Sequence, residues 1–162
     1  MHTGSRPTVE PTPNKISFTD EDAFLFDHPH SNALVITAPI MAIKIHHIMV
    51  DTGAYASILY YRIFKKMEID RKEMQPCRER IQGSNGQMTT PIGQVMLPIR
   101  FVEKRQPTRT ILETFKIEDC PSEYNAILGR TALYKLRGDV SIYHYSIKFP
   151  SSDGERTHRG DQ

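Results

Sequence analysis

The sequence predicts an all-β domain, a small closed or folded-over β structure that carries two short helices. Three observations support this prediction. Between residues 31 and 150, most apolar residues alternate with polar ones in short β-branched runs, which is the period of strands with one buried face. Only two stretches show the spacing of a helix. The hydrophobic content of 38% supplies one modest core, and 162 residues fit one domain with spare length for tails.

The first two strands are expected at residues 33–38 (ALVITA) and 43–50 (IKIHHIMV). Both runs are dominated by aliphatic and β-branched residues, which favour extended backbone. Pro39 follows the first run. It is expected to mark the break between the two strands, because proline cannot donate a hydrogen bond to a neighbouring strand.

The hydrophobic period changes in residues 57–67 (SILYYRIFKKM). Leu59, Ile63 and Met67 recur every four residues, while three basic residues fall on the other side. This spacing predicts a short amphipathic helix over the stretch.

Residues 80–101 (RIQGSNGQMTTPIGQVMLPIRF) contain two strand-like runs around a tight turn. Asn85 and Gly86 form the strongest short-range signal for a β-hairpin, because both residues tolerate the positive φ of a type I′ turn. The stretch therefore predicts a glycine-rich hairpin.

The remaining elements follow the same logic. Residues 110–117 (TILETFKI) alternate and predict a strand, and residues 124–138 contain an apolar run that is broken at Gly129. A short helix is expected after that glycine, with Gly138 ending it. Residues 140–149 (VSIYHYSIKF) alternate again and predict one late strand.

The two ends of the chain differ from the middle in composition. Residues 1–30 hold three prolines among threonine and serine in their first half, which predicts a flexible N-terminal segment. Residues 151–162 (SSDGERTHRGDQ) are polar and are expected to be a C-terminal tail. The predicted folded domain therefore spans residues 31–150.

Several classes of function receive no support from the sequence. The net charge is only +2 and the basic residues are scattered, so no nucleic acid is expected to bind. No apolar run approaches the roughly 20 residues of a membrane span, and no signal-peptide core is visible at the N-terminus. The two cysteines, Cys77 and Cys120, predict reduced thiols in an intracellular, cytoplasmic protein that is not secreted. His46 and His47 are neighbours on a predicted strand and point to opposite faces, so no metal site is expected.

One carboxylate stands at the end of a buried strand, in the stretch IMVDTGAYASIL (residues 48–59). The apolar strand delivers Asp51 into the turn formed by Thr52 and Gly53, where an isolated charge is costly unless it is paired. An aspartic protease needs such a carboxylate twice, because two adjacent acids share one proton and activate water between them. The chain holds no second Asp-Thr-Gly or Asp-Ser-Gly. The partner of Asp51 is therefore expected to be Asp51 of a second copy in a symmetric dimer.

The chain resembles the retropepsins, specifically the protease segment of plant Ty3/Gypsy-type retrotransposon polyproteins. The likeness extends from about Ile16 to Gln162 and rests on four stretches in the family's order and spacing. These are ALVITA, VDTGAYASILYYRIFKKM, GSNGQMTTPIGQVMLPIRF and DCPSEYNAILGRTALYKLRGDVSIYHYSIKFP. The resemblance implies a retropepsin-type acid-protease fold, which is a small closed β structure with a flap hairpin and one or two short helices.

The resemblance also implies roles for individual residues. Asp51 is the expected catalytic acid, in an active-site loop that continues through Thr52, Gly53 and Ala54. Thr52 is expected to brace the two loops across the dimer axis, and Gly53 to accept substrate backbone. The expected flap, a lid over the bound peptide, contains Gly83, Ser84, Asn85 and Gly86. The expected support of the active-site loop is the stretch Ile127, Leu128 and Gly129.

Three positions depart from the family's usual pattern. Tyr55 follows Ala54 where small residues are usual, and it is expected to crowd the substrate groove. Ser57 stands where an aspartate is common, so Arg130 is expected to lack a carboxylate partner at this loop. Ser84 occupies a flap-tip position where relatives tend to have phenylalanine.

These expectations combine into one function with an alternative. The chain is expected to be a homodimeric aspartic endopeptidase that hydrolyses an extended polypeptide with an activated water and needs no cofactor or metal. By resemblance, its substrate is the polyprotein of a retrotransposon. The alternative is a catalytically inactive, protease-derived dimerisation or peptide-binding module.

Overall fold

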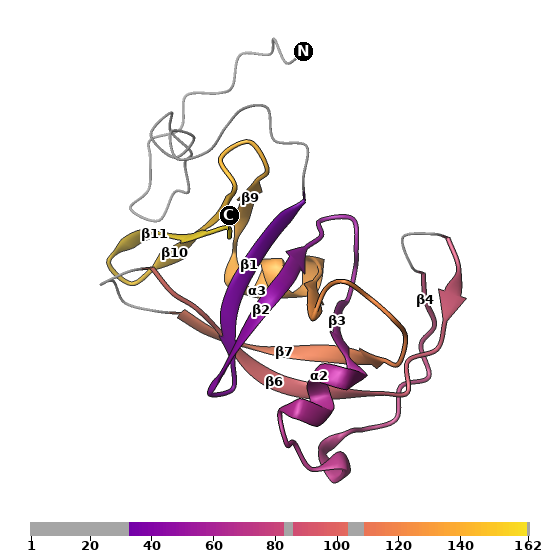
Figure 1. Cartoon of the computed structure of the whole chain (residues 1–162). Coiled ribbons are helices and arrows are strands. Elements are labelled where there is room, and N and C mark those ends of the chain that lie inside the picture. Colours follow the sequence, from indigo (N-terminus) through magenta and orange to yellow (C-terminus); the bar gives the residue numbers. More distant parts are fainter. Residues whose placement is uncertain (1–32, 83–85, 104–108, 162) are drawn as a thin grey trace.

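The structure is a computed structural model that describes residues 33–82, 86–103 and 109–161 (Figure 1). The expected N-terminal segment, residues 1–30, lies outside the described residues. The elements in chain order are β1 (Leu34–Ile40), β2 (Ile43–Val50), β3 (Ser57–Tyr60), α2 (Tyr61–Lys66), the 3-10 turn η1 (Arg71–Glu73), β4 (Ile81–Gln82), β5 (Met88–Thr89), β6 (Gly93–Phe101), β7 (Arg109–Glu118), β8 (Ala126–Leu128), α3 (Arg130–Leu136), β9 (Asp139–Ser141), β10 (Ser146–Ser151) and β11 (Gly154–Arg159).

Six strands close into a barrel in the order β1-β2-β8-β3-β7-β6. The β1–β2 and β6–β7 pairs are antiparallel neighbours in sequence, and the second runs over nine residue pairs. Two parallel pairs, β2–β8 and β3–β7, join strands that are distant in sequence. The predicted closed all-β structure is confirmed, as are the predicted strands at β1, β2 and β7.

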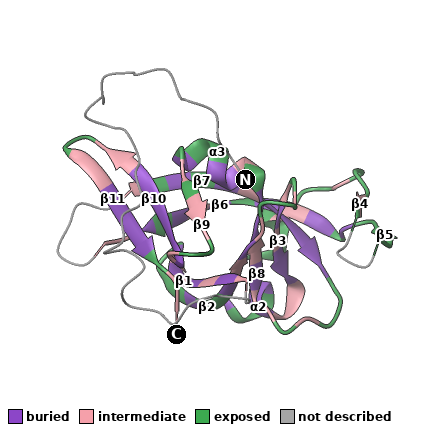
Figure 2. Cartoon of the chain, turned by 90° about the horizontal axis from the view of Figure 1, so that it is seen from above, coloured by how far each residue is buried: buried purple, intermediate pink, exposed green. Residues whose placement is uncertain are grey.

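The alternation read from the sequence decides which side chains fill the barrel. Along β1, every second residue from Leu34 to Ile40 is fully buried, and β6 repeats this pattern over its nine residues. Figure 2 shows the same buried stretches along the strands. Helix α3 adds its own buried residues, Ala132, Leu133 and Leu136. Burying an aliphatic side chain of this size stabilises a fold by roughly 1.5–3 kcal/mol.

The prediction of a helix over residues 57–67 is wrong for the first four residues. Ser57–Tyr60 form strand β3, and the helix α2 covers only Tyr61–Lys66. β3 lies between β7, with which it pairs in parallel, and β8, with which it pairs antiparallel. Hydrogen bonding on both edges and burial on both faces favour a strand over the helical spacing of the side chains. The later part is the short amphipathic helix that was predicted, with Ile63 and Phe64 buried.

The sequence predicted that Pro39 marks the break between the first two strands, and this prediction is wrong. It lies within β1, opposite Lys44 of β2, and the chain reverses at Met41, which has a φ of 57°. A proline is tolerated here because β1 pairs with β6 only at Ile40, so little hydrogen bonding is lost on that side.

The C-terminal region is more ordered than its composition suggested. Residues 140–149 form parts of two strands, β9 and β10, which pair with each other across a turn. Residues 151–162, expected to be a polar tail, contain β11, which pairs with β10 along its whole length. Composition missed this strand because its polar side chains find polar partners on neighbouring segments. Lys148 Nζ lies 3.0 Å from Glu155 Oε1, for example.

The C-terminal end is also attached to the barrel. The Asp161 backbone N–H donates to the Val35 carbonyl at 2.7 Å, and Thr37 Oγ1 donates to the Asp161 carboxylate at 2.7 Å. We therefore propose that the folded unit extends to Asp161 and not only to residue 150. Within the described ranges, no helix has the length and apolar character needed to cross a membrane.

A buried histidine in this sheet makes stability depend on pH. His158 is 3% exposed, its Nδ1 accepts from the Val102 N–H at 3.1 Å, and its Nε2 lies 2.9 Å from the Thr37 carbonyl oxygen. Burial lowers the pKa of His158 below its ordinary value of 6.5, and the Thr37 bond and the charge of Asp161 oppose this only in part. As the pH falls, His158 is therefore protonated in the unfolded chain before it is protonated in the folded chain. The histidine's contribution to the free energy of unfolding is complete above pH 6.5 and is lost as the pH falls below it.

We expect urea unfolding between about pH 7.5 and pH 5 to show this loss in the wild type. The His158→Gln variant keeps an acceptor and a donor without a titrating group, so its stability should fall less over the same range. Identical pH dependence in the two proteins would contradict the assignment.

Candidate active site

Asp51 directly follows β2 and is held by the backbone around it. Its N–H donates to the Leu128 carbonyl at 2.9 Å, which continues the pairing of β2 with β8. Its carboxylate Oδ1 accepts from the Gly53 N–H at 2.8 Å, and its carbonyl accepts from the Ala54 N–H at 3.2 Å. Asp51 is half-buried, so its carboxylate has a fixed position and remains accessible.

The expected active-site loop, Asp51 to Ala54, continues through Tyr55 and Ala56 to the start of β3, and the whole loop of residues 51–56 lies against the start of α3. The backbone N–H groups of Arg130 and Thr131 donate to the carbonyls of Ala54 and Tyr55, at 2.8 and 3.1 Å. At Gly129 a Cβ atom would lie 2.5 Å from the Ala56 carbonyl oxygen, so no side chain fits there. Ile127 and Leu128, the other residues expected to support the loop, pair with Met49 and Val50 of β2. The structure thus brings together Asp51 and all three expected support residues.

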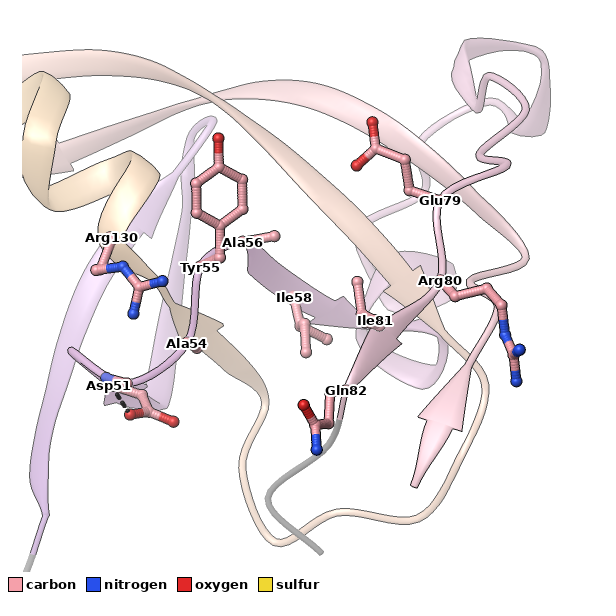
Figure 3. Close-up of a pocket in the computed structure, with 11 residues that line it drawn as sticks. Asp51, Ala54, Tyr55, Ala56, Ile58, Glu79, Arg80, Ile81, Gln82 and Arg130 are labelled. Atoms are coloured by element: carbon pink, nitrogen blue, oxygen red, sulfur yellow. Dashed lines mark hydrogen bonds between the residues drawn. The ribbon is translucent and has the colours of Figure 1, made fainter. Parts of the chain in front are cut away.

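A pocket of 480 Å³ opens beside the loop. One wall consists of Asp51 and residues 53–56, and the opposite wall consists of residues 79–82, which lead into and form β4 (Figure 3). The guanidinium of Arg130 lies on the loop side, between Tyr55 and Asp51 in the view of Figure 3. The size is within the range of sites that bind small molecules or peptide side chains.

The expected flap is described only in part. Gly83, Ser84 and Asn85 lie outside the described residues, so the structure shows nothing of the flap tip. On either side, β4 and β5 pair antiparallel, with Gln82 opposite Met88. Gly86 has a φ of 82°, a left-handed conformation that side chains with a Cβ rarely adopt.

The base of this hairpin is attached to β7 by polar contacts on both arms. Thr89 Oγ1 donates to Glu118 Oε1 at 2.9 Å, and Lys116 Nζ lies 3.5 Å from Glu79 Oε2. The hairpin therefore leaves the barrel from a fixed base and adjoins the pocket.

We predict that Gly86→Val lowers kcat/KM about tenfold if the hairpin is a working flap. Nothing lies within 4 Å of a Cβ at this position, so the cost is conformational and not steric. For a residue with a Cβ, the left-handed backbone conformation costs roughly 1–2 kcal/mol of conformational free energy, and a cost of this size corresponds to about a factor of ten in rate. The matched control is Gly154→Val, since Gly154 also has a positive φ of 128° and open space around it but is the first residue of β11, far from the flap in sequence. Equal kcat/KM in the two variants, measured on folded protein, would count against a flap.

The departures seen in the sequence have structural consequences at this loop. Tyr55 is 68% exposed and lines the pocket, and the Arg130 guanidinium lies 5.8 Å from its ring centroid. Arg130 Nη1 donates to the Thr52 carbonyl at 3.1 Å. Ser57 is fully buried, and its hydroxyl donates to Glu113 at 2.6 Å. Arg130 is thus held by the loop backbone and an aromatic ring.

Sequence reasoning missed Glu113. In β7, strand alternation puts Ile111, Glu113, Phe115 and Ile117 on one face, and all four are buried. The sequence did contain a signal for it, namely one carboxylate among the apolar residues of the buried face of this strand. Of the residues that the structure describes, no group of three or more His, Cys, Asp or Glu could hold a metal ion.

Comparisons with known proteins identify the fold. No protein-family model and no curated protein matches the chain. Among solved structures, the chain is similar to the retroviral protease-like domain of Ddi1 from Leishmania major, with a TM-score of 0.59 and 16% identity over 80% of this chain and 94% of that one. A retropepsin-like aspartic protease from Rickettsia conorii matches with a TM-score of 0.47 and 18% identity, over 66% of this chain and 75% of that one. With its closed barrel, the chain therefore has a retropepsin-type acid-protease fold.

Proposed function

We propose that this protein is an aspartic-type endopeptidase in which Asp51 is the catalytic acid. The observation that carries the proposal is the Asp51 carboxylate, fixed by the Gly53 N–H at 2.8 Å and facing an open pocket in a retropepsin-type fold. A rigid, accessible carboxylate beside a groove is what general-base activation of water requires.

The second carboxylate is proposed to come from another copy of the chain. Among the described residues that line the pocket, Glu79 is the other acid. It is on the opposite wall in Figure 3, and it forms an ion pair with Lys116. It is therefore poorly placed to share a proton with Asp51. A two-fold axis through the active-site loop would instead place two Asp51 carboxylates side by side.

In the proposed mechanism, the two carboxylates share one proton. One Asp51 takes a proton from water, the water oxygen attacks the peptide carbonyl carbon, and the other Asp51 gives its proton to the carbonyl oxygen, which forms a tetrahedral gem-diol. The first Asp51 then gives its proton to the amide nitrogen and the C–N bond breaks, while the other Asp51 takes a proton back from a gem-diol hydroxyl, so that an acid and an amine leave and the pair again shares one proton. Thr52 braces the paired loops, and the Gly53 backbone contacts the substrate. The hairpin at Gly86 closes over the peptide and excludes water.

The proposed substrate is an extended polypeptide. The sequence resemblance to plant Ty3/Gypsy-type elements supports the more specific proposal that it is a retrotransposon polyprotein, cleaved in the cytoplasm. No cofactor enters this chemistry, because carboxylates and water supply every proton that moves.

The test is a proteolysis assay on the purified protein with a mixture of unstructured polypeptides at about pH 4 to 7. We expect cleavage that pepstatin, an aspartic-protease inhibitor, suppresses. Cleavage that resists pepstatin but stops with a metal chelator or a thiol reagent would contradict the proposal.

A second candidate function is a catalytically inactive dimerisation or peptide-binding module. The observation that favours it is Tyr55, a largely exposed ring that stands in the pocket next to the loop that carries Asp51. A dimer that binds polypeptide without cleaving it at any pH would support this candidate. If the Tyr55→Ala variant cleaves polypeptide and the wild type does not, the ring blocks an otherwise competent site.

A further inference from the structure

Glu113 is a buried carboxylate that the proposed mechanism does not use. It lies in the middle of β7, and its side chain is 1% exposed. A charged group is costly to bury unless hydrogen bonds and an opposite charge compensate for the lost water. Its place beneath the active-site loop therefore needs an explanation.

Three side chains donate hydrogen bonds to this carboxylate. Ser57 Oγ and Thr131 Oγ1 both donate to Oε2, at 2.6 and 2.7 Å, and Lys135 Nζ donates to Oε1 at 2.9 Å. Ser57 begins β3, while Thr131 and Lys135 lie near the two ends of α3. One carboxylate thus joins three elements of the fold.

These contacts continue to the active-site loop. Ser57 directly follows the loop, and its hydroxyl also accepts from the Gly129 N–H at 3.0 Å. The Thr131 N–H donates to the Tyr55 carbonyl within the loop at 3.1 Å. The single oxygen Oε2 therefore holds both the end of the loop and the helix start on which the loop rests.

We propose that Glu113 is a positioning residue for Asp51. It fixes the loop and thereby the separation of the two Asp51 carboxylates across the dimer axis. The inference rests on the proposed function, because that separation matters only if the two acids share a proton. Such pairs work only when the carboxylates are a few ångströms apart, and sites of this kind must be held to within about 0.5 Å.

The main test is Glu113→Gln, which keeps the shape of the side chain. A glutamine offers one acceptor oxygen in place of two, and its NH₂ group faces donors, so the three donors cannot all be satisfied. We expect kcat to fall about 10- to 100-fold, with KM changed less than about threefold, because positioning acts on the transition state. A pair of acids that works only with one shared proton should give a bell-shaped pH profile of kcat, and its limbs should also move in this variant, because they depend on the distance between the two acids.

The matched control is Glu155→Gln. Glu155 also accepts from a lysine, Lys148, at 3.0 Å, but it lies in the β10–β11 hairpin. This variant should lose some stability and keep the kcat and pH profile of the wild type. Glu113→Gln behaving in the same way would overturn the proposal, since its role would then be structural only.

A milder pair of variants applies if Glu113→Gln does not fold. Thr131→Val removes one of the two donors to Oε2 while keeping the side-chain shape, and Thr131→Ser keeps the hydroxyl. We expect a reduced kcat in Thr131→Val and near wild-type kcat in Thr131→Ser. Wild-type kcat in both would contradict the proposal.

Hydrogen exchange separates this inference from the proposed function, because it needs no catalysis. The amides of Gly129 and Thr131 should exchange at least about tenfold faster in Glu113→Gln than in Glu155→Gln. If the wild type cleaves nothing, the proposed function fails, and faster exchange would still show that Glu113 holds the loop. Unchanged exchange would overturn the inference even in an active enzyme.

Discussion

Replacing Asp51 with asparagine is expected to abolish peptide cleavage while leaving the fold intact. The amide has the shape of the carboxylate and can still accept from the Gly53 N–H, so the loop keeps its geometry. It cannot take a proton from water, and loss of a general base costs about 10²- to 10⁴-fold in rate. The measurement is kcat/KM of Asp51→Asn, with circular dichroism and thermal unfolding on the same preparation.

The matched control for this variant is Glu79→Gln. Glu79 lines the same pocket, but its ion pair with Lys116 gives it no part in the proposed proton transfer. We expect the control to change KM more than kcat. Activity of Asp51→Asn above a few per cent of wild type would remove Asp51 from the catalytic role.

Cleavage is also expected to require two chains. Because the proposed site takes one carboxylate from each chain, specific activity should fall when the protein is diluted below the dimer dissociation constant. The measurement is activity per subunit across a dilution series, with sedimentation on the same samples. Full activity in a fraction that sediments as a monomer would refute the homodimer proposal.

Mixing subunits provides an independent test of the shared site. Excess Asp51→Asn chains should form heterodimers with only one ionisable acid and so inhibit the wild type. At a threefold excess, random pairing would leave about one quarter of the activity per wild-type subunit, since only that fraction of wild-type chains meets another wild-type chain. Glu79→Gln chains at the same excess should not inhibit.

The sequence by itself determined the class of fold and singled out Asp51 as the candidate catalytic acid. The alternation in β1 and β6 is a local property of the chain, and burial of one face of each strand follows from it. Asp51 could be identified for the same reason, because it directly follows the apolar residues 48–50 at the end of β2.

Only the tertiary structure decided which segments pair over long distances. Ser57–Tyr60 have helical spacing but become β3, since β7 and β8 satisfy their backbone on both edges. Residues 154–159 have the composition of a tail but become β11, since β10 supplies a backbone partner and neutralising charges.

The role assigned to Glu113 depends on the same kind of information. Strand alternation could have placed it inside the protein, but Ser57 and Thr131 are 56 and 18 residues away in the chain. Alternation fixes which face of a strand a side chain occupies. The partners it meets there depend on how distant strands come together, because hydrogen bonds and desolvation act between groups that are close in space, whatever their separation in sequence.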